Sequence, residues 1–141
     1  MTATGITLQD NDIRQINELI IEHSWLLDHG RWHDAVELYT DDARMEIGGN
    51  VLEGRSALLT WADRRATDKG RRTHHQCTNV RLVPIAEGTV EGSVMLVLHV
   101  SIDGAPATVE FVGEYRDRYR RNPQGHWRFE RRSVLSISDP T

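Results

Sequence analysis

The sequence predicts an α+β fold, in which helices in the first half of the chain precede a sheet in the second half. Apolar residues up to about Trp61 recur at the spacing of amphipathic helices, whereas from Thr73 onward they follow the alternation of strands. No internal repeat, linker or low-complexity segment divides the chain. We therefore expect three helices followed by a meandering sheet, in a single domain of residues 1–141.

The first helix is expected from about Asp12 to Asp28 and should end at Gly30. Its first turn can be capped by Asp10, Asn11 or Asp12. Its apolar positions, repeated at helical intervals, are Ile13, Ile16, Ile20 and Leu27. This spacing predicts one buried face.

Two shorter helices should follow. The second helical pattern runs from about Arg31 into the polar segment TDDA. Its apolar positions are Trp32, Ala35, Val36 and Tyr39. The third begins after Gly54 and ends in the charged segment DRRATDKGRR. Its apolar positions are Leu58, Leu59 and Trp61.

The second half predicts strands. Residues 74–84 alternate in polarity, and the segment GSVMLVLHVSI, apolar at both parities, is typical of a central strand covered on both faces. The segment ATVEFVGEYRDRYRR alternates like a half-buried strand, and HWRFERRSVLSIS should pair antiparallel with it through the turn NPQG. A short further strand is allowed at ARMEIGG.

Composition narrows the class of protein. The net charge of −4 carries no basic excess, so we expect no nucleic-acid partner. No apolar run approaches the roughly 20 residues that cross a bilayer, and the N-terminus lacks the pattern of a signal peptide, so we expect no membrane association. The single cysteine, Cys77, cannot form an intrachain disulfide, which favours a cytoplasmic location.

Asp28 is the first candidate for chemistry. At 100° per residue it lies near the apolar stripe of the first helix, so its carboxylate should be half buried. Burial would raise its pKa, and a neighbouring imidazole would lower it again. The alternative is a structural aspartate that bonds to the backbone of the next turn.

Three histidines on predicted strands are further candidates. His74 and His75 must point to opposite faces of a strand, and the parity of Val80 and Leu82 favours His74 as the inward residue. His99 lies within an apolar strand, where an imidazole needs a bonding partner. It can be a satisfied core residue or a second proton donor or acceptor in a pocket.

The familiar cofactor and metal motifs are missing. His29 and His33 have the spacing of a helical zinc pair, but Gly30 interrupts the helix between them, so we expect no metal site. The sequence has no GxSxG, Walker or GxGxxG motif. The arginines of RDRYRR and RFERR alternate with acidic residues, which predicts a salt-bridged, solvated sheet face, although Arg131 or Arg132 could enter a cavity.

Four segments together resemble the SnoaL-like, scytalone dehydratase-like branch of the nuclear transport factor 2-like superfamily: HSWLLDHGRWHDAVELYTDDARMEIGG, LEGRSALLTWA, THHQCTN and GEYRDRYRRNPQGHWRFERRSV. The resemblance covers nearly the whole chain. It implies a cone formed by a curved, mixed or antiparallel sheet packed against three N-terminal helices, enclosing an apolar pocket. It also implies a homodimer joined through the sheets.

The resemblance implies an active site as well. Asp28, followed by Trp32 in DHGRWHD, matches the family's catalytic aspartate, and His75 in THHQCTN matches its catalytic histidine, which overrides the parity argument for His74. The family's substrate-donating tyrosine is replaced by His23. The expected substrate contacts are His23, Trp25, Tyr39, Asn79, His99 and Arg132.

These residues suggest a dehydratase or isomerase that needs no cofactor. Asp28 would orient His75, whose other nitrogen would act as general base and acid on a small hydrophobic, hydroxylated carbonyl compound, cyclic or aromatic. The alternative is a non-catalytic role, as a ligand-binding protein or like the small subunit of a ring-hydroxylating dioxygenase. The fold alone does not decide between the two.

Overall fold

The computed structural model describes residues 5–140, so residues 1–4 and 141 of the expected domain lie outside the described part. The α+β prediction is confirmed: three helices pack against one six-stranded sheet. The elements, in chain order, are α1 (Asp10–Asp28), α2 (Trp32–Val36), β1 (Tyr39–Ile47), β2 (Asn50–Glu53), α3 (Gly54–Ala66), β3 (Arg71–Ala86), β4 (Thr89–Ile102), β5 (Thr108–Arg121) and β6 (Trp127–Ser136).

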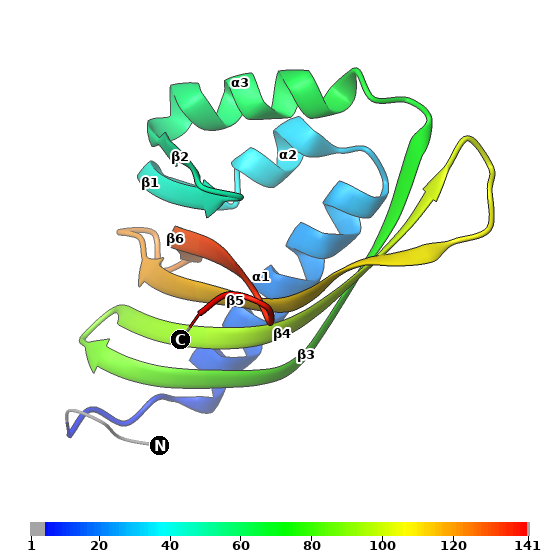
Figure 1. The fold of residues 1–141 in the computed structure, drawn as a ribbon. Helices are drawn as coiled ribbons and strands as arrows, with labels where there is room; N and C mark the ends of the chain where they lie inside the picture. The colour runs from blue at the N-terminus through cyan, green and yellow to red at the C-terminus, as the bar shows by residue number, and fades with distance from the viewer. Residues whose placement is uncertain (1–4, 141) are drawn as a thin grey trace.

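The sheet is open and curved. Its strand order is β2-β1-β6-β5-β4-β3, and every neighbouring pair is antiparallel except β1 and β6, which are parallel. The long strands β3, β4 and β5 bend, and the helices lie on one side of the sheet (Figure 1). Helix α1 packs against β3 and β6, while α3 packs against β1 and α2. Residues on β3 and on the end of α1 are thereby brought together.

Helix α1 forms where the apolar spacing predicts it. Ile16, Leu19 and Ile20 are buried on its inner face, and the chain leaves the helix through Gly30, whose φ of 72° suits glycine. The expected side-chain cap is wrong, because Gln9 occupies the N-cap and makes no side-chain capping bond.

Two predictions for the middle of the chain need correction. The second helix ends at Val36, and Tyr39 begins strand β1 instead, because β1 pairs in parallel with β6. Strand β4 lies inside the sheet, but only one of its faces is covered: Met95 on the outer face is 54% exposed. The prediction that both faces of this strand are covered is therefore wrong, although apolar residues occur at both parities.

Candidate active site

The carboxylate of Asp28 lies at the end of α1 and receives several hydrogen bonds from β3. Nδ1 of His75 lies 2.6 Å from Oδ1 of Asp28, and the backbone N–H of His75 donates to Oδ2 over 3.0 Å. The hydroxyl of Thr73 donates to Oδ1 over 2.8 Å. The side chains of His75 and Asp28 are only 9% and 12% exposed. Hydrogen bonds from both the side chain and the backbone of His75 thus hold the pair in one geometry.

These contacts control the charge of Asp28. Burial raises the pKa of its carboxyl group, but the hydrogen bonds from His75 and Thr73 outweigh burial and hold the pKa below its ordinary value. Asp28 is therefore a carboxylate at neutral pH. A carboxylate at Nδ1 fixes the tautomer of His75 with a proton on Nδ1, which leaves Nε2 with a free lone pair.

His75 lies on the wall of an apolar cavity of about 420 Å³. The cavity lies between the helices and the inner face of the sheet, and its apolar lining is Leu27, Trp32, Met45, Ile47, Trp61, Leu96, Leu98, Phe111 and Val134. Asp28 lines two neighbouring clefts instead. The imidazole can therefore reach a ligand in the cavity, while the carboxylate acts through the imidazole.

A buried polar cluster forms another part of the cavity wall. Arg132 donates to Asp117 through Nε (2.8 Å) and Nη2 (2.9 Å), and its Nη1 lies 3.2 Å from Nδ1 of His23. Nε2 of His23 lies 3.0 Å from the hydroxyl of Tyr39. The hydroxyl of Tyr119 donates to Asp117 over 2.6 Å. His23, Tyr39 and Arg132 all line the cavity.

Charges in this cluster are fixed by burial and pairing. Burial, and then the nearby Arg132 cation, hold the pKa of His23 well below its ordinary value, so His23 is neutral. Burial alone would lower the pKa of Arg132, but the Asp117 carboxylate raises it well above its ordinary value. The cavity wall therefore carries a neutral imidazole beside a permanently charged guanidinium.

Three of the expected substrate contacts lie outside this cavity. Trp25 is 48% exposed and stacks on His29, on the outer side of α1. His99 pairs across the strands with His74 and lines a separate cleft. Asn79 is exposed, and its positive φ of 54° belongs to a bulge in β3. The structure therefore places these three side chains away from the cavity, and their contact with a substrate stays a prediction.

The same bulge explains why strand parity favoured the wrong histidine. Thr78 pairs with Met95 and Arg81 pairs with Ser93, so two residues of β3 lie opposite one residue of β4. The bulge changes the parity of the inner face. Before it, the inward residues are Thr73, His75 and Cys77, and after it they are Val80 and Leu82. His74 is exposed on the outer face.

The alternating charges of RDRYRR predict a solvated face, and for Asp117, the acidic residue of this segment, that prediction is wrong. Its side chain is fully buried in the ion pair with Arg132. One signal was available in the sequence: Asp117 has the parity of the apolar residues Tyr115 and Tyr119. A charged residue at an inward position needs a buried partner, which here is supplied by β6.

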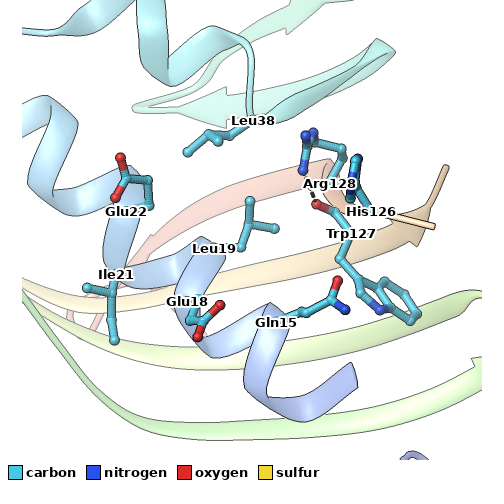
Figure 2. A pocket seen from close by; sticks show the side chains of 9 residues that line it. All are labelled: Gln15, Glu18, Leu19, Ile21, Glu22, Leu38, His126, Trp127 and Arg128. Atoms are coloured by element: carbon cyan, nitrogen blue, oxygen red, sulfur yellow. Dashed lines mark hydrogen bonds between the residues drawn. The ribbon is translucent and has the colours of Figure 1, made fainter. Parts of the chain in front are cut away.

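A wider hollow of about 530 Å³ lies between α1 and the start of β6 (Figure 2). Glu18 and Glu22 come from α1, and His126 and Arg128 lie across from them. None of the site residues expected from the sequence lines this hollow. It is separate from the Asp28–His75 pair.

Among residues 5–140, no group of three or more His, Cys, Asp or Glu side chains is arranged to hold a metal ion. Within the same residues, no helix combines the length and apolarity needed to span a membrane.

Several solved structures are similar to this one. Rv3472, a protein of unknown function from Mycobacterium tuberculosis, shares 24% identity over 94% of this chain and 82% of its own, with a TM-score of 0.82. A candidate scytalone dehydratase from Novosphingobium aromaticivorans shares 19% identity, with 90% and 85% covered and a TM-score of 0.80. A candidate aromatic ring hydroxylase from the same species shares 18% identity, with 94% of each chain covered and a TM-score of 0.82.

Identities this low establish a shared fold and leave the reaction open. No curated protein matches the chain significantly in sequence. The profile of the SnoaL-like domain, in contrast, matches residues 10–133, which include α1 and most of β6. Because this match spans nearly the whole chain, the protein belongs to the SnoaL-like domain family.

Proposed function

We propose that the protein is a cofactor-independent lyase that dehydrates a small hydrophobic, hydroxylated carbonyl compound, cyclic or aromatic. The observation that carries this proposal is the Asp28–His75 hydrogen bond of 2.6 Å, with the imidazole on the wall of an apolar cavity. A cavity of about 420 Å³ has room for a small ring system.

The proposed mechanism uses one imidazole twice. Nε2 of His75 removes the proton from the carbon next to the substrate carbonyl, and Asp28 stabilises the imidazolium that forms. The imidazolium then returns this proton to the hydroxyl group on the β-carbon, which leaves as water while the C=C bond forms. If the proton returns to a different carbon, the same pair catalyses an isomerisation.

A non-catalytic role is the second candidate. Similarity to a candidate aromatic ring hydroxylase is consistent with a small subunit that holds catalytic partners together, or with a ligand-binding protein. The open cavity beside His75 favours the enzyme over the scaffold, because a scaffold has no use for unfilled apolar volume next to a paired histidine.

Bicyclic β-hydroxy ketones provide the test, because their dehydration to conjugated enones is visible by ultraviolet absorbance. We expect turnover by the wild-type protein and a loss of about 10²–10⁴-fold in His75→Ala, the usual contribution of general acid–base catalysis. His74→Ala is the matched control, since it removes an adjacent imidazole from the outer face. Turnover that survives His75→Ala, or a panel without any turnover, would reject the lyase.

We also propose a homodimer formed through the outer face of the sheet. Met95 and Val112 on neighbouring strands β4 and β5 are 54% and 42% exposed, and such apolar area is commonly covered by a partner. Light scattering should give twice the mass of the chain, and Met95→Asp should shift it toward the monomer. A monomeric wild-type protein at micromolar concentration would contradict this proposal.

A further inference from the structure

Tyr39 places a phenol group in the wall of the same cavity that His75 lines. It is the first residue of β1, its side chain is buried, and its hydroxyl lies 3.0 Å from Nε2 of His23. A hydroxyl can either donate to this nitrogen or accept from it. The direction of that one bond decides whether Tyr39 has a proton to offer to a ligand.

Arg132 settles the direction. A guanidinium only donates, so its 3.2 Å contact with Nδ1 of His23 requires Nδ1 to be the acceptor. Two bonds to the buried carboxylate of Asp117 hold Arg132 in this position. A neutral imidazole that accepts at Nδ1 carries its proton on Nε2. His23 therefore donates to Tyr39 rather than accepting from it.

The hydroxyl proton of Tyr39 is then left without a use inside the protein. Among residues 5–140, no side chain or carbonyl group accepts a hydrogen bond from it. Because a buried donor without an acceptor is costly, an acceptor from a bound ligand in the cavity would satisfy it.

We infer that Tyr39 donates a hydrogen bond to the carbonyl oxygen of the substrate, and that His23 and Arg132 are positioning residues that aim this donor. The inference rests on the proposed dehydration and deepens it by assigning the group that binds the carbonyl. When His75 removes the neighbouring proton, negative charge develops on this oxygen, and a donor already in place stabilises it. The phenol keeps its proton, which is shared with the enolate oxygen.

The tautomer of His23 can be measured without a substrate. In ¹⁵N NMR spectra of the wild-type protein, we expect Nε2 of His23 to carry the proton and Nδ1 to be unprotonated at pH 7.5. A proton on Nδ1, or a doubly protonated ring, would overturn the inference.

Kinetics test the donor itself. Tyr39→Phe should lower kcat by about 10²–10³-fold, as for the loss of one oxyanion donor, with a smaller change in KM. His23→Gln should retain most of the activity, since a glutamine can accept from Arg132 and donate to Tyr39, whereas His23→Leu should behave like Tyr39→Phe. Equal activity in His23→Gln and His23→Leu would show that the orientation of the bond has no role.

A ligand probe separates this inference from the proposed reaction. The carbonyl stretch of bound 1-tetralone, an aromatic cyclic ketone, should shift to lower frequency in the wild-type protein and return in Tyr39→Phe. If His75→Ala abolishes turnover while Tyr39→Phe does not, the inference fails and the lyase stands. If no hydroxy ketone reacts but the carbonyl shift depends on Tyr39, the lyase fails and the binding role stands. A ketone that does not bind, or whose stretch is unchanged, overturns the binding role.

Discussion

Replacing Asp28 with asparagine tests the central pair with little change in volume. The charge centres of a carboxylate and an imidazolium joined by a 2.6 Å contact lie about 4 Å apart, and at an effective dielectric constant of about 20 they attract by about 4 kcal/mol. Since each 1.36 kcal/mol is tenfold in rate, Asp28→Asn should lower kcat/KM by about a thousandfold. Both side chains are largely buried, so solvent screens this attraction little.

The asparagine also disturbs the local hydrogen bonds. Oδ2 of Asp28 accepts the backbone N–H of His75 over 3.0 Å, so an amide NH₂ at this position would place two donors against each other. The opposite orientation of the amide would place its NH₂ against the hydroxyl of Thr73 and Nδ1 of His75. We therefore also expect ¹⁵N NMR spectra of the variant to show His75 as a mixture of tautomers.

The assay is the kcat/KM of a substrate found in the hydroxy ketone panel, measured at a temperature at which both the wild type and the variant are fully folded. Asp63→Asn is the matched control, because Asp63 contacts His33 over the same 2.6 Å but on the exposed surface. This control should stay within about twofold of the wild-type rate, since exposed ion pairs contribute little. A loss of less than tenfold in a folded Asp28→Asn variant would refute the reasoning about the pair.

Three further predictions concern stability, measured by urea unfolding. His23 is held neutral by burial, and unfolding below about pH 6.5 lets it bind a proton, so stability should fall with decreasing pH by up to about 1.4 kcal/mol per unit from this group; His23→Gln should lose that part of the slope. Arg132→Met should cost about 3–5 kcal/mol by leaving Asp117 unpaired, and a second change, Asp117→Leu, should restore much of it. Gly113→Ala should cost at least about 1–3 kcal/mol, because a Cβ there would lie 2.0 Å from the carbonyl oxygen of Leu135.

Local patterns were sufficient for most of the fold. The helical spacing of Ile16 and Ile20 predicts α1, and the alternation around Tyr115 and Tyr119 predicts β5, because each of these elements buries one face. Strand β1 was partly missed, since its parallel partner β6 lies about 90 residues later in the chain and no local pattern reports that pairing.

The candidate site shows the same limit more sharply. Family resemblance pointed to Asp28 and His75, but the ion pair of Arg132 with Asp117 joins two strands whose charges look solvated in the sequence. Alternating charges on a strand predict an exposed face only if every inward position is apolar. Two inward positions, one on β5 and one on β6, carry opposite charges, and each is tolerated only because of the other.

The bulge at Asn79 is the feature of β3 that keeps both His75 and Val80 on the inner face, so the site depends on one residue in a left-handed conformation. Asn tolerates the φ of 54°, and a β-branched residue does not. Asn79→Gly should therefore be at least as stable as the wild type, whereas Asn79→Val should lose about 1–2 kcal/mol.

Deleting Asn79 should have a different effect from either substitution. The deletion would leave one residue of β3 opposite one residue of β4, so His75 and Val80 would be four positions apart and regular pairing would keep both on the same face. We therefore expect the folded deletion variant to keep the ¹⁵N signature of the Asp28–His75 hydrogen bond. If the folded deletion variant loses this signature, or if Asn79→Val is as stable as Asn79→Gly, the bulge at Asn79 does not set the parity of β3.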